Sequence, residues 1–237
     1  MKILNLYANI GGNRKLWGDE HEITAVEIDP KIAAIYTDFW PKDKMVVGDA
    51  HQYLLEHYAE FDFIWSSPPC PTHSQVGRLR AFNEHNKATG QYSPAKYPDM
   101  KLYEEILFLK GYHEGKWCVE NVVAWYEPLI RPQQFGGHWF WVNFPMPEVR
   151  GEIRGITTKG KNDREVRAER TGFNLDKYKG IDKRLALRDC TEPELGKHIL
   201  EWSQKQWHHT QSLLATQTEA SVTANDKGAP ITNPSQE

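Results

Sequence analysis

A short apolar strand that runs into a proline-fixed cysteine constrains this chain more than any other feature. Residues 61–65 read Phe-Asp-Phe-Ile-Trp, an aromatic-rich run typical of a buried strand. The run ends at residues 66–71, Ser-Ser-Pro-Pro-Cys-Pro, where prolines fix φ and remove backbone donors. Open α/β sheets place reacting groups just beyond the carboxyl ends of their strands, so we expect Cys70 to be functional. The alternative is a small buried thiol beside a turn.

Strands and helices alternate along the first half of the chain. Strands are predicted over residues 3–7, 23–28, 45–47, 61–65 and 117–122, and helices over residues 31–39, 52–58 and 101–109. This alternation predicts an α/β fold with a doubly wound, mostly parallel sheet. Residues 135–144 predict one more strand, in which Gly136-Gly137 allows a bulge or a close backbone approach, and residues 193–206 predict an amphipathic helix.

The composition limits the class of protein. A chain of 237 residues with 39% hydrophobic content can bury the core of one domain, which we place at residues 1–209. Residues 210–237 are rich in Gln, Thr, Ser and Ala, which predicts a disordered tail. No apolar run approaches the ~20 residues of a membrane span, and no signal peptide precedes the first strand. The three cysteines lack metal-type spacing, so we expect an intracellular, cytoplasmic protein without a metal site.

Charge is distributed unevenly. Between residues 150 and 188 there are 12 Lys and Arg against 6 Asp and Glu, whereas the whole chain carries −3. A basic segment on an acidic body is typical of a surface that faces a polyanion. An ordinary solvated surface is the alternative, and charge alone does not choose between them.

Polar and glycine residues follow several predicted strands. The turn at residues 8–12 ends in Gly11-Gly12, which permits a ligand to approach the backbone closely. Glu27 ends the second strand, where a carboxylate can accept from ribose hydroxyls. Asp49 follows the third strand and either contacts a ligand or caps the next helix. Glu120, at the end of an apolar strand, is either a structural ion-pair partner or an acid that exchanges protons.

These residues carry a family resemblance. At Pro68-Pro69-Cys70-Pro71-x-x-Ser74 and at Glu120-Asn121-Val122, the chain resembles the DNA (cytosine-5) methyltransferases. Residues 5–12, Asn-Leu-Tyr-Ala-Asn-Ile-Gly-Gly, look like that family's Asp-Leu-Phe-x-Gly-x-Gly-Gly motif, which cradles S-adenosylmethionine. The resemblance implies a Rossmann-like methyltransferase fold, this cofactor, and DNA with a flipped cytosine as the partner. Motifs from residue 4 to about 202 take part in it.

The resemblance also implies roles for individual residues. Cys70 would be the nucleophile, Glu120 the acid at N3 of the base, and Asn121 the residue that holds the proline loop. The cofactor-binding positions would be Tyr7, Ala8, Ile10, Gly11, Gly12, Glu27, Ile28, Asp49, Ala50, Pro69 and Cys190. The substrate-binding positions would be Ser74, Arg78 and His138.

Two departures from the family pattern stand out. The family carries Gln-x-Arg-x-Arg on a strand, but residues 134–138 read Gln-Phe-Gly-Gly-His, so both arginines are missing and His138 stands in the last position. The family also inserts a large target-recognition domain, for which this chain has only the basic segment 145–188. Residues 79–99 lack periodicity and predict a flap over the site.

The sequence therefore predicts a monomeric enzyme that methylates carbon 5 of cytosine in DNA through a covalent bond between Cys70 and carbon 6. Such an enzyme would suit a bacterial or phage-infected cell, including a restriction-modification system. Three alternatives stay open: C5 modification of RNA or nucleotides, transfer of another group from a modified cofactor, and a non-catalytic nucleic-acid-binding homologue.

Overall fold

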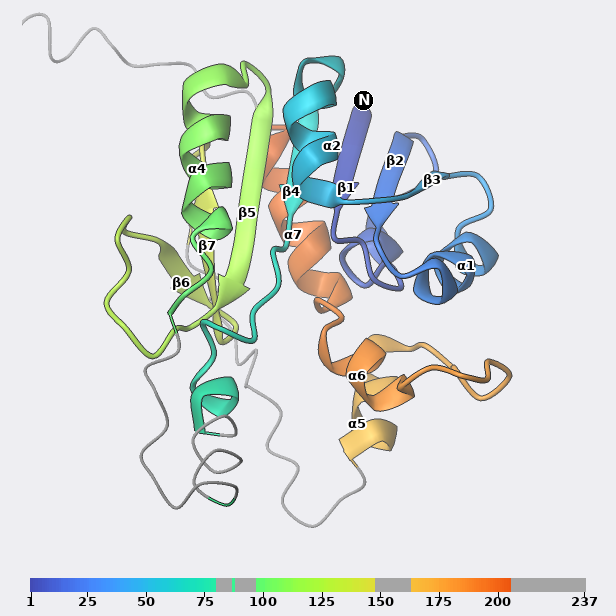
Figure 1. Cartoon of the computed structure of the whole chain (residues 1–237). Helices are drawn as coiled ribbons and strands as arrows, with labels where there is room; N and C mark the ends of the chain where they lie inside the picture. The colour runs from blue at the N-terminus through green and yellow to red at the C-terminus, as the bar shows by residue number, and fades with distance from the viewer. Residues whose placement is uncertain (80–86, 88–96, 148–162, 206–237) are drawn as a thin grey trace, which may run out of the picture. The chain divides into compact units, whose positions relative to one another are not determined.

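The structure is a computed structural model that describes residues 1–79, 87, 97–147 and 163–205. Met1–Gln204 form one compact unit (Figure 1). Most of the predicted flap, the first part of the basic segment and the predicted tail lie outside the described residues. Within the described part of the chain, no helix combines the length and apolar character that a bilayer crossing demands.

A seven-stranded sheet organises this unit, with strand order β3-β2-β1-β4-β5-β7-β6. The first five strands pair in parallel, and β7 is antiparallel to both of its neighbours. The mostly parallel, doubly wound sheet that the alternation predicted is thus confirmed. The strands are β1 Lys2–Leu6, β2 Glu22–Glu27, β3 Lys44–Val47, β4 Phe63–Ser66, β5 Lys116–Val122, β6 Gln133–Phe135 and β7 His138–Val142.

Helices cover both faces of the sheet (Figure 1). They are α1 Pro30–Phe39, α2 Ala50–His57, α4 Lys101–Tyr112, α5 Asp163–Thr171, α6 Lys183–Arg188 and α7 Pro193–Ser203, with short 3₁₀ turns at Asn13–Leu16 and Tyr58–Glu60. Helices α1, α2, α4 and α7 follow the predicted positions closely, whereas α5 and α6 were not predicted. Both lie in the charged segment, where few apolar residues reveal a helical period.

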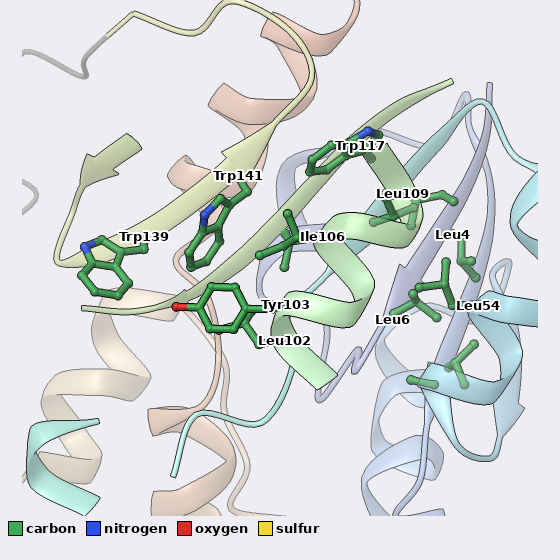
Figure 2. Close-up of a cluster of buried hydrophobic side chains, with 14 of the residues drawn as sticks. Leu4, Leu6, Leu54, Leu102, Tyr103, Ile106, Leu109, Trp117, Trp139 and Trp141 are labelled. Carbon is green, nitrogen blue, oxygen red and sulfur yellow. The ribbon is translucent and has the colours of Figure 1, made fainter. Parts of the chain in front are cut away.

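Alternation along the strands builds two cores. Leu4 and Leu6 of β1 pack with Leu54 of α2 and with Ile106 and Leu109 of α4 (Figure 2). Ile3, the residue before Leu4, belongs to the core on the other face, with residues of β4, β5, β7 and α7. Successive side chains of a strand point to opposite faces, so a strand buried on both faces is apolar nearly throughout.

The single strand predicted over residues 135–144 is instead a hairpin. Gly136 and Gly137 have φ of +58° and +78° and form the two-residue turn between β6 and β7. Two consecutive positive φ values are what a tight hairpin turn requires, and glycine supplies them without strain. The glycine pair therefore reverses the chain rather than forming a bulge, and it places His138 opposite Val122 on β5.

The order of the strands fixes where a ligand can bind. From β1 the chain winds outward through β2 and β3, then returns to the other side of β1 as β4. At this point of reversal the loops after β1 and β4 diverge from the carboxyl edge of the sheet, which is where doubly wound folds bind ligands. The glycine turn and the Cys70 loop are these two loops.

Candidate active site

The loop after β4 holds Cys70 in a defined place. The carbonyl of Cys70 accepts from the backbone N–H groups of His73 and Ser74, at 3.0 and 2.9 Å. The Ser74 hydroxyl in turn accepts from the N–H of Gly77 at 2.9 Å, which starts the helical turn at 75–79. The cysteine thus sits between a proline-rich segment and a capped helical turn, with its side chain half-buried.

Asn121 joins the next strand to this loop. Its Nδ2 donates to the carbonyl of Pro68 at 2.9 Å, and the Asn121 side chain is buried. Because β4 and β5 are adjacent and parallel, with Ser66 in register with Val119, their ends are neighbours in space. The geometry places Cys70 and Glu120 on the same edge of the sheet, within electrostatic range of each other.

Glu120 is buried and faces His138. Its Oε1 lies 3.7 Å from Nε2 of His138, which the β6–β7 turn presents from the neighbouring strand. The other imidazole nitrogen, Nδ1, lies 3.1 Å from the carbonyl oxygen of Gly136. A carbonyl only accepts, so Nδ1 is the nitrogen that donates to Gly136, and Nε2 is the nitrogen that faces Glu120.

The electrostatics of Cys70 favour the thiol. Burial raises its pKa to about 11, and the negative charges of Asp189 and Glu120 act in the same direction. Arg188 is the cation that opposes them and lowers this pKa. Since the thiolate is the reactive form of cysteine, the unreactive thiol predominates at pH 7 before a substrate enters.

Residues 188 and 189, which end α6, therefore belong to this site. The sequence predicted a role for neither residue: Arg188 lies in the basic segment, and Asp189 precedes the predicted cofactor position Cys190. Arg188 Nε donates to Asp189 Oδ1 at 2.9 Å, which fixes the guanidinium near the cysteine loop. No motif in the sequence marks Arg188, because its approach to Cys70 arises from the packing of α6.

The turn after β1 is tightly held. Tyr7 and Asn9 have positive φ values of 55° and 47°, and Gly11 has 80°. The N–H of Asn9 donates to Glu27 Oε2 at 3.0 Å, so the carboxylate at the end of β2 fixes the turn. Positive φ is costly for a tyrosine, and such conformations persist where the surrounding structure determines them, often at ligand sites.

The other predicted cofactor positions share this edge of the sheet. Ile28 follows β2 directly and is 68% exposed, an unusual state for a large apolar side chain at a strand end. Asp49 is the N-cap of α2, since its Oδ1 accepts from the N–H groups of His51 and Gln52. Ala50 begins that helix and is buried, whereas Pro69 is exposed beside Cys70.

The residues at this edge of the sheet fit S-adenosylmethionine. Glu27 offers carboxylate oxygens where a ribose would lie, and Ile28 offers an exposed apolar surface for an adenine ring. Tyr7, Ala8, Ile10 and Gly11 would surround the methionine end, although Ala8 and Ile10 are themselves buried in the core. The cofactor would supply an activated methyl group at this position.

Gly12 and Cys190 serve packing at this turn. A Cβ at Gly12 would lie 2.2 Å from Cys190 Sγ and 2.2 Å from the carbonyl oxygen of Thr191. Glycine is therefore needed here because the segment before α7 passes directly over it. Cys190 is fully buried, and burial raises its pKa to about 12, so its thiol is inert.

The remaining substrate-side residue, Arg78, stacks on an aromatic ring. Its guanidinium lies 4.3 Å from the ring centroid of Trp125, whose Nε1 donates to the carbonyl of Thr72. Val76 and Leu79 on the same turn are 66% and 62% exposed. The structure thus gathers a cation and apolar side chains immediately after Cys70.

A buried network beneath the site was missed by sequence reasoning. Glu105 of α4 is completely buried and accepts from the hydroxyls of Tyr7 and Ser66. Nδ1 of His51 lies 3.1 Å from its Oε1. The carboxylate thus ties the ends of β1 and β4 to α2. A charged residue in an apolar helix was the available signal, because such a residue needs buried partners.

Comparison with solved structures gives several similar folds. A variant of Spodoptera frugiperda DNMT2 matches at 24% identity, over 51% of this chain and 35% of that chain, with a TM-score of 0.33. Entamoeba histolytica methyltransferase EhMeth matches at 13% identity over 52% and 38% of the two chains, with a TM-score of 0.32. A TehB-like SAM-dependent methyltransferase from Corynebacterium glutamicum matches at 15% identity over 50% and 53%, with a TM-score of 0.31. The chain therefore spans about a third of the DNMT2 chain. No curated protein matches its sequence.

The family comparison concerns the part of the chain that contains the glycine turn, Glu27, Asp49 and Cys70. Residues 1–90 match the model of the family described as C-5 cytosine-specific DNA methylase. S-adenosylmethionine is the cofactor of this family, in agreement with the positions of Glu27 and Ile28 along the sheet edge. Over residues 1–90, the chain is therefore similar to the C-5 cytosine-specific DNA methylase family.

Proposed function

We propose that the protein transfers a methyl group from S-adenosylmethionine to carbon 5 of a cytosine in DNA. The observation that carries the proposal is the placement of Cys70 and Glu120 at the ends of the adjacent strands β4 and β5. The bond from Asn121 to Pro68 holds these ends together at 2.9 Å. A nucleophile and a proton donor at one sheet edge suit addition to a polarised ring.

The chain's residues account for the activation of the base. The Cys70 thiolate adds to carbon 6, the C5–C6 π electrons move toward carbon 5, and Glu120 gives a proton to N3. After carbon 5 has taken up the methyl group, its proton passes to solvent water, and the electron pair left on carbon 5 forms the C5–C6 double bond again and expels the thiolate. The N3 proton then returns to Glu120. His138, 3.7 Å from that carboxyl group, supports these proton transfers.

Cys70 must lose its proton before it attacks. Its pKa of about 11 disfavours this in the free protein, mainly because of burial. Binding of substrate has to change the balance, either by neutralising Glu120 or by drawing Asp189 away from the thiol. Arg188 already lowers this pKa, so it is the residue that stabilises the thiolate.

The surroundings of Cys70 suit a nucleic acid. The stacked Arg78 and the exposed Val76 and Leu79 adjoin the site, and apolar side chains there can fill the space that a flipped base leaves. Flipping a base costs a few kcal/mol in a duplex. The described part of the basic segment, α5 and α6, supplies cations for phosphate contacts, which predicts strong salt dependence.

RNA or a free nucleotide is a second candidate substrate. The observation that favours it is the short connection between β7 and Cys190, which offers little room for a domain that reads duplex DNA. The chemistry at Cys70 and Glu120 would be the same with each of these substrates.

Mass spectrometry of nucleosides tests the proposal. DNA, RNA and dCMP are incubated separately with the protein and labelled S-adenosylmethionine, and the digested products are analysed. The proposal predicts label in 5-methyldeoxycytidine from DNA. Label only in RNA or in the nucleotide would select the second candidate, and label in N4-methylcytosine would contradict the C5 chemistry.

A further inference from the structure

A small pocket adjoins the candidate active site. It lies between the β6–β7 turn and helices α5 and α6, and it has a volume of about 120 Å³. At ~30 Å³ for each water molecule, it has room for about four waters or for a group of similar size. Its charged lining residues are His138, Arg167, Arg170, Arg188 and Glu192.

Three ion pairs fix the arginines of this pocket. Arg167 Nε donates to Asp163 Oδ1 at 2.8 Å, and Arg188 Nε donates to Asp189 Oδ1 at 2.9 Å. Arg170 is paired with Glu192, one of the lining residues. A guanidinium has five N–H donors in a planar fork, so a carboxylate held at Nε, as in Arg167 and Arg188, orients the fork and directs the Nη groups away from that carboxylate.

These side chains are also partly buried. The exposed fractions are 19% for Arg167, 27% for Arg170, 33% for Arg188 and 26% for His138. Partly buried, ion-paired arginines lose little conformational freedom when a ligand binds, which favours affinity. Because the three carboxylates offset much of the positive charge, the pocket would recognise an anion by directed hydrogen bonds more than by net charge.

The glycine turn leaves one side of the pocket accessible. Gly136 and Gly137 both line it, and a Cβ placed on Gly137 would meet no atom within 4 Å. A ligand can therefore approach the turn without displacing a side chain. The pocket thus combines oriented N–H donors with an open backbone, which is the composition of an oxyanion site.

The pocket shares two residues with the candidate active site. His138 lines the pocket and lies 3.7 Å from Glu120, and Arg188 lines it and acts on Cys70. In a nucleotide, one sugar joins the phosphate to the base. A phosphate bound in this pocket would therefore be linked through that sugar to the base that reacts with Cys70. A nucleoside or a free base carries no such group.

The geometry points to a binding site for the phosphate of the target nucleotide in the pocket formed by Arg167, Arg170, Arg188 and His138. This inference rests on the proposed function and narrows its substrate class to phosphate-bearing cytosine, in a polynucleotide or as a free nucleotide. The bound phosphate would place the base against Cys70, and its contact with Arg188 would couple substrate binding to the charge balance around the thiol.

Binding measurements on the full chain test this inference without requiring catalysis. A cytosine-containing single-stranded oligonucleotide is compared with the same oligonucleotide carrying neutral methylphosphonates on both sides of the cytosine. Calorimetry gives both affinities for the wild type and for Arg167→Gln and Arg167→Lys. Lys183→Gln is the control on α6, since Lys183 donates to the carbonyl of Asp176 and does not line the pocket. Deoxycytidine and 5′-dCMP form a second pair of ligands.

We expect the wild type to bind the normal oligonucleotide at least tenfold more tightly than the methylphosphonate form. Arg167→Gln should lower the affinity for the unmodified oligonucleotide but not for the methylphosphonate form. The two affinities should then be equal, as expected if Arg167 contacts the phosphate directly. Arg167→Lys should remove most of this difference in affinity between the two oligonucleotides, and Lys183→Gln should retain it. A loss seen only with dCMP would assign the pocket to free nucleotides.

The inference is overturned if folded Arg167→Gln and Arg167→Lys both keep the wild-type difference in affinity in each pair of ligands. It is also overturned if Lys183→Gln reduces that difference as much as the Arg167 variants do. These outcomes do not depend on methyl transfer. The phosphate site can therefore fail while methylation is observed, and it can hold in a protein that transfers no methyl group.

Discussion

Nε2 of His138 lies 3.7 Å from Oε1 of Glu120. The strand that carries His138 comes from the β6–β7 hairpin, and its glycine turn fixes the imidazole through Nδ1. In the proposed mechanism, this imidazole supports the proton transfer between Glu120 and N3 of a bound cytosine.

His138→Ala should therefore lower kcat of methyl transfer by about 10²-fold, the usual effect of removing a residue that assists proton transfer. KM should rise as well, because His138 also lines the pocket proposed to bind the target phosphate. Steady-state kinetics with labelled cofactor measure both constants. Gln133→Ala, an exposed position on the same hairpin, is the matched control and should leave kcat unchanged. Equal losses in the two variants would show that the hairpin fold, rather than the imidazole, is responsible.

Cys70 should react slowly with alkylating agents at neutral pH. Burial raises its pKa to about 11, so the thiolate is present above that pH and is lost as the pH falls. The rate of modification by iodoacetamide should rise about tenfold for each pH unit from 7 to 10, whereas an ordinary cysteine levels off near its pKa of about 8.5. Peptide mass spectrometry measures the rate, with Cys70→Ala as the blank.

The neighbours of Cys70 should shift this pH profile in opposite directions. Asp189→Asn removes a negative charge and should move the profile to lower pH, and Arg188→Gln should move it to higher pH. A plateau near pH 8.5 in the wild type, or the same profile in both variants, would contradict the arrangement around the thiol.

Gly12→Ala should destabilise the protein. Its backbone angles suit alanine, but the added Cβ would lie 2.2 Å from Cys190 Sγ and from the carbonyl oxygen of Thr191. Overpacking of this kind costs about 1–3 kcal/mol of unfolding free energy, or roughly 2–12 °C in Tm for a domain of this size. Gly48→Ala is the control, because no atom lies within 4 Å of a Cβ there. Thermal melts compare the two, and equal Tm values would show that the segment before α7 does not pack on Gly12.

Glu105→Ala should be among the most destabilising substitutions near the site. It removes the acceptor of Tyr7 and Ser66 and the partner of His51, and it leaves a buried cavity. Loss of one partner from a buried charged network costs about 3–5 kcal/mol. Glu104→Ala, the next residue toward the amino terminus, removes a side chain that is 61% exposed and should cost far less. Urea unfolding of both variants measures the difference, which would be absent if the network were not formed.

The parts of the fold that repeat a pattern were predictable from the sequence. Alternating strands and helices predicted the parallel sheet, because buried strands and amphipathic helices have distinct periods. For Asp49 the sequence predicted either a ligand contact or a helix cap, and the structure shows that it caps α2. Residues 135–144 were predicted as one strand, with the glycine pair as a bulge or a close backbone approach, whereas the pair forms the turn of a hairpin. Glycine suits a bulge and a two-residue turn equally, so only the pairing of the strands separates them.

Site residues that depend on long-range packing could not be predicted from the sequence. Cys70, Glu120 and Asn121 follow strands, so their common edge was predictable once the sheet was parallel. Arg188 comes close to Cys70 through the packing of a short helix in a charged segment, and no local signal marks that contact. Glu105 carries a local signal, its charge among apolar residues, but its partners come from three other elements and could not be predicted.

Covalent trapping tests the central claim most directly. Oligonucleotides of DNA and RNA containing 5-fluorocytosine are incubated with the protein and S-adenosylmethionine, since fluorine cannot leave carbon 5 as the proton does and the bond to carbon 6 persists. Denaturing mass spectrometry should show one added oligonucleotide with one methyl group, mapped to Cys70 and absent in Cys70→Ala. An adduct that persists in Cys70→Ala, or no adduct with DNA and RNA alike in the folded wild type, would contradict the account.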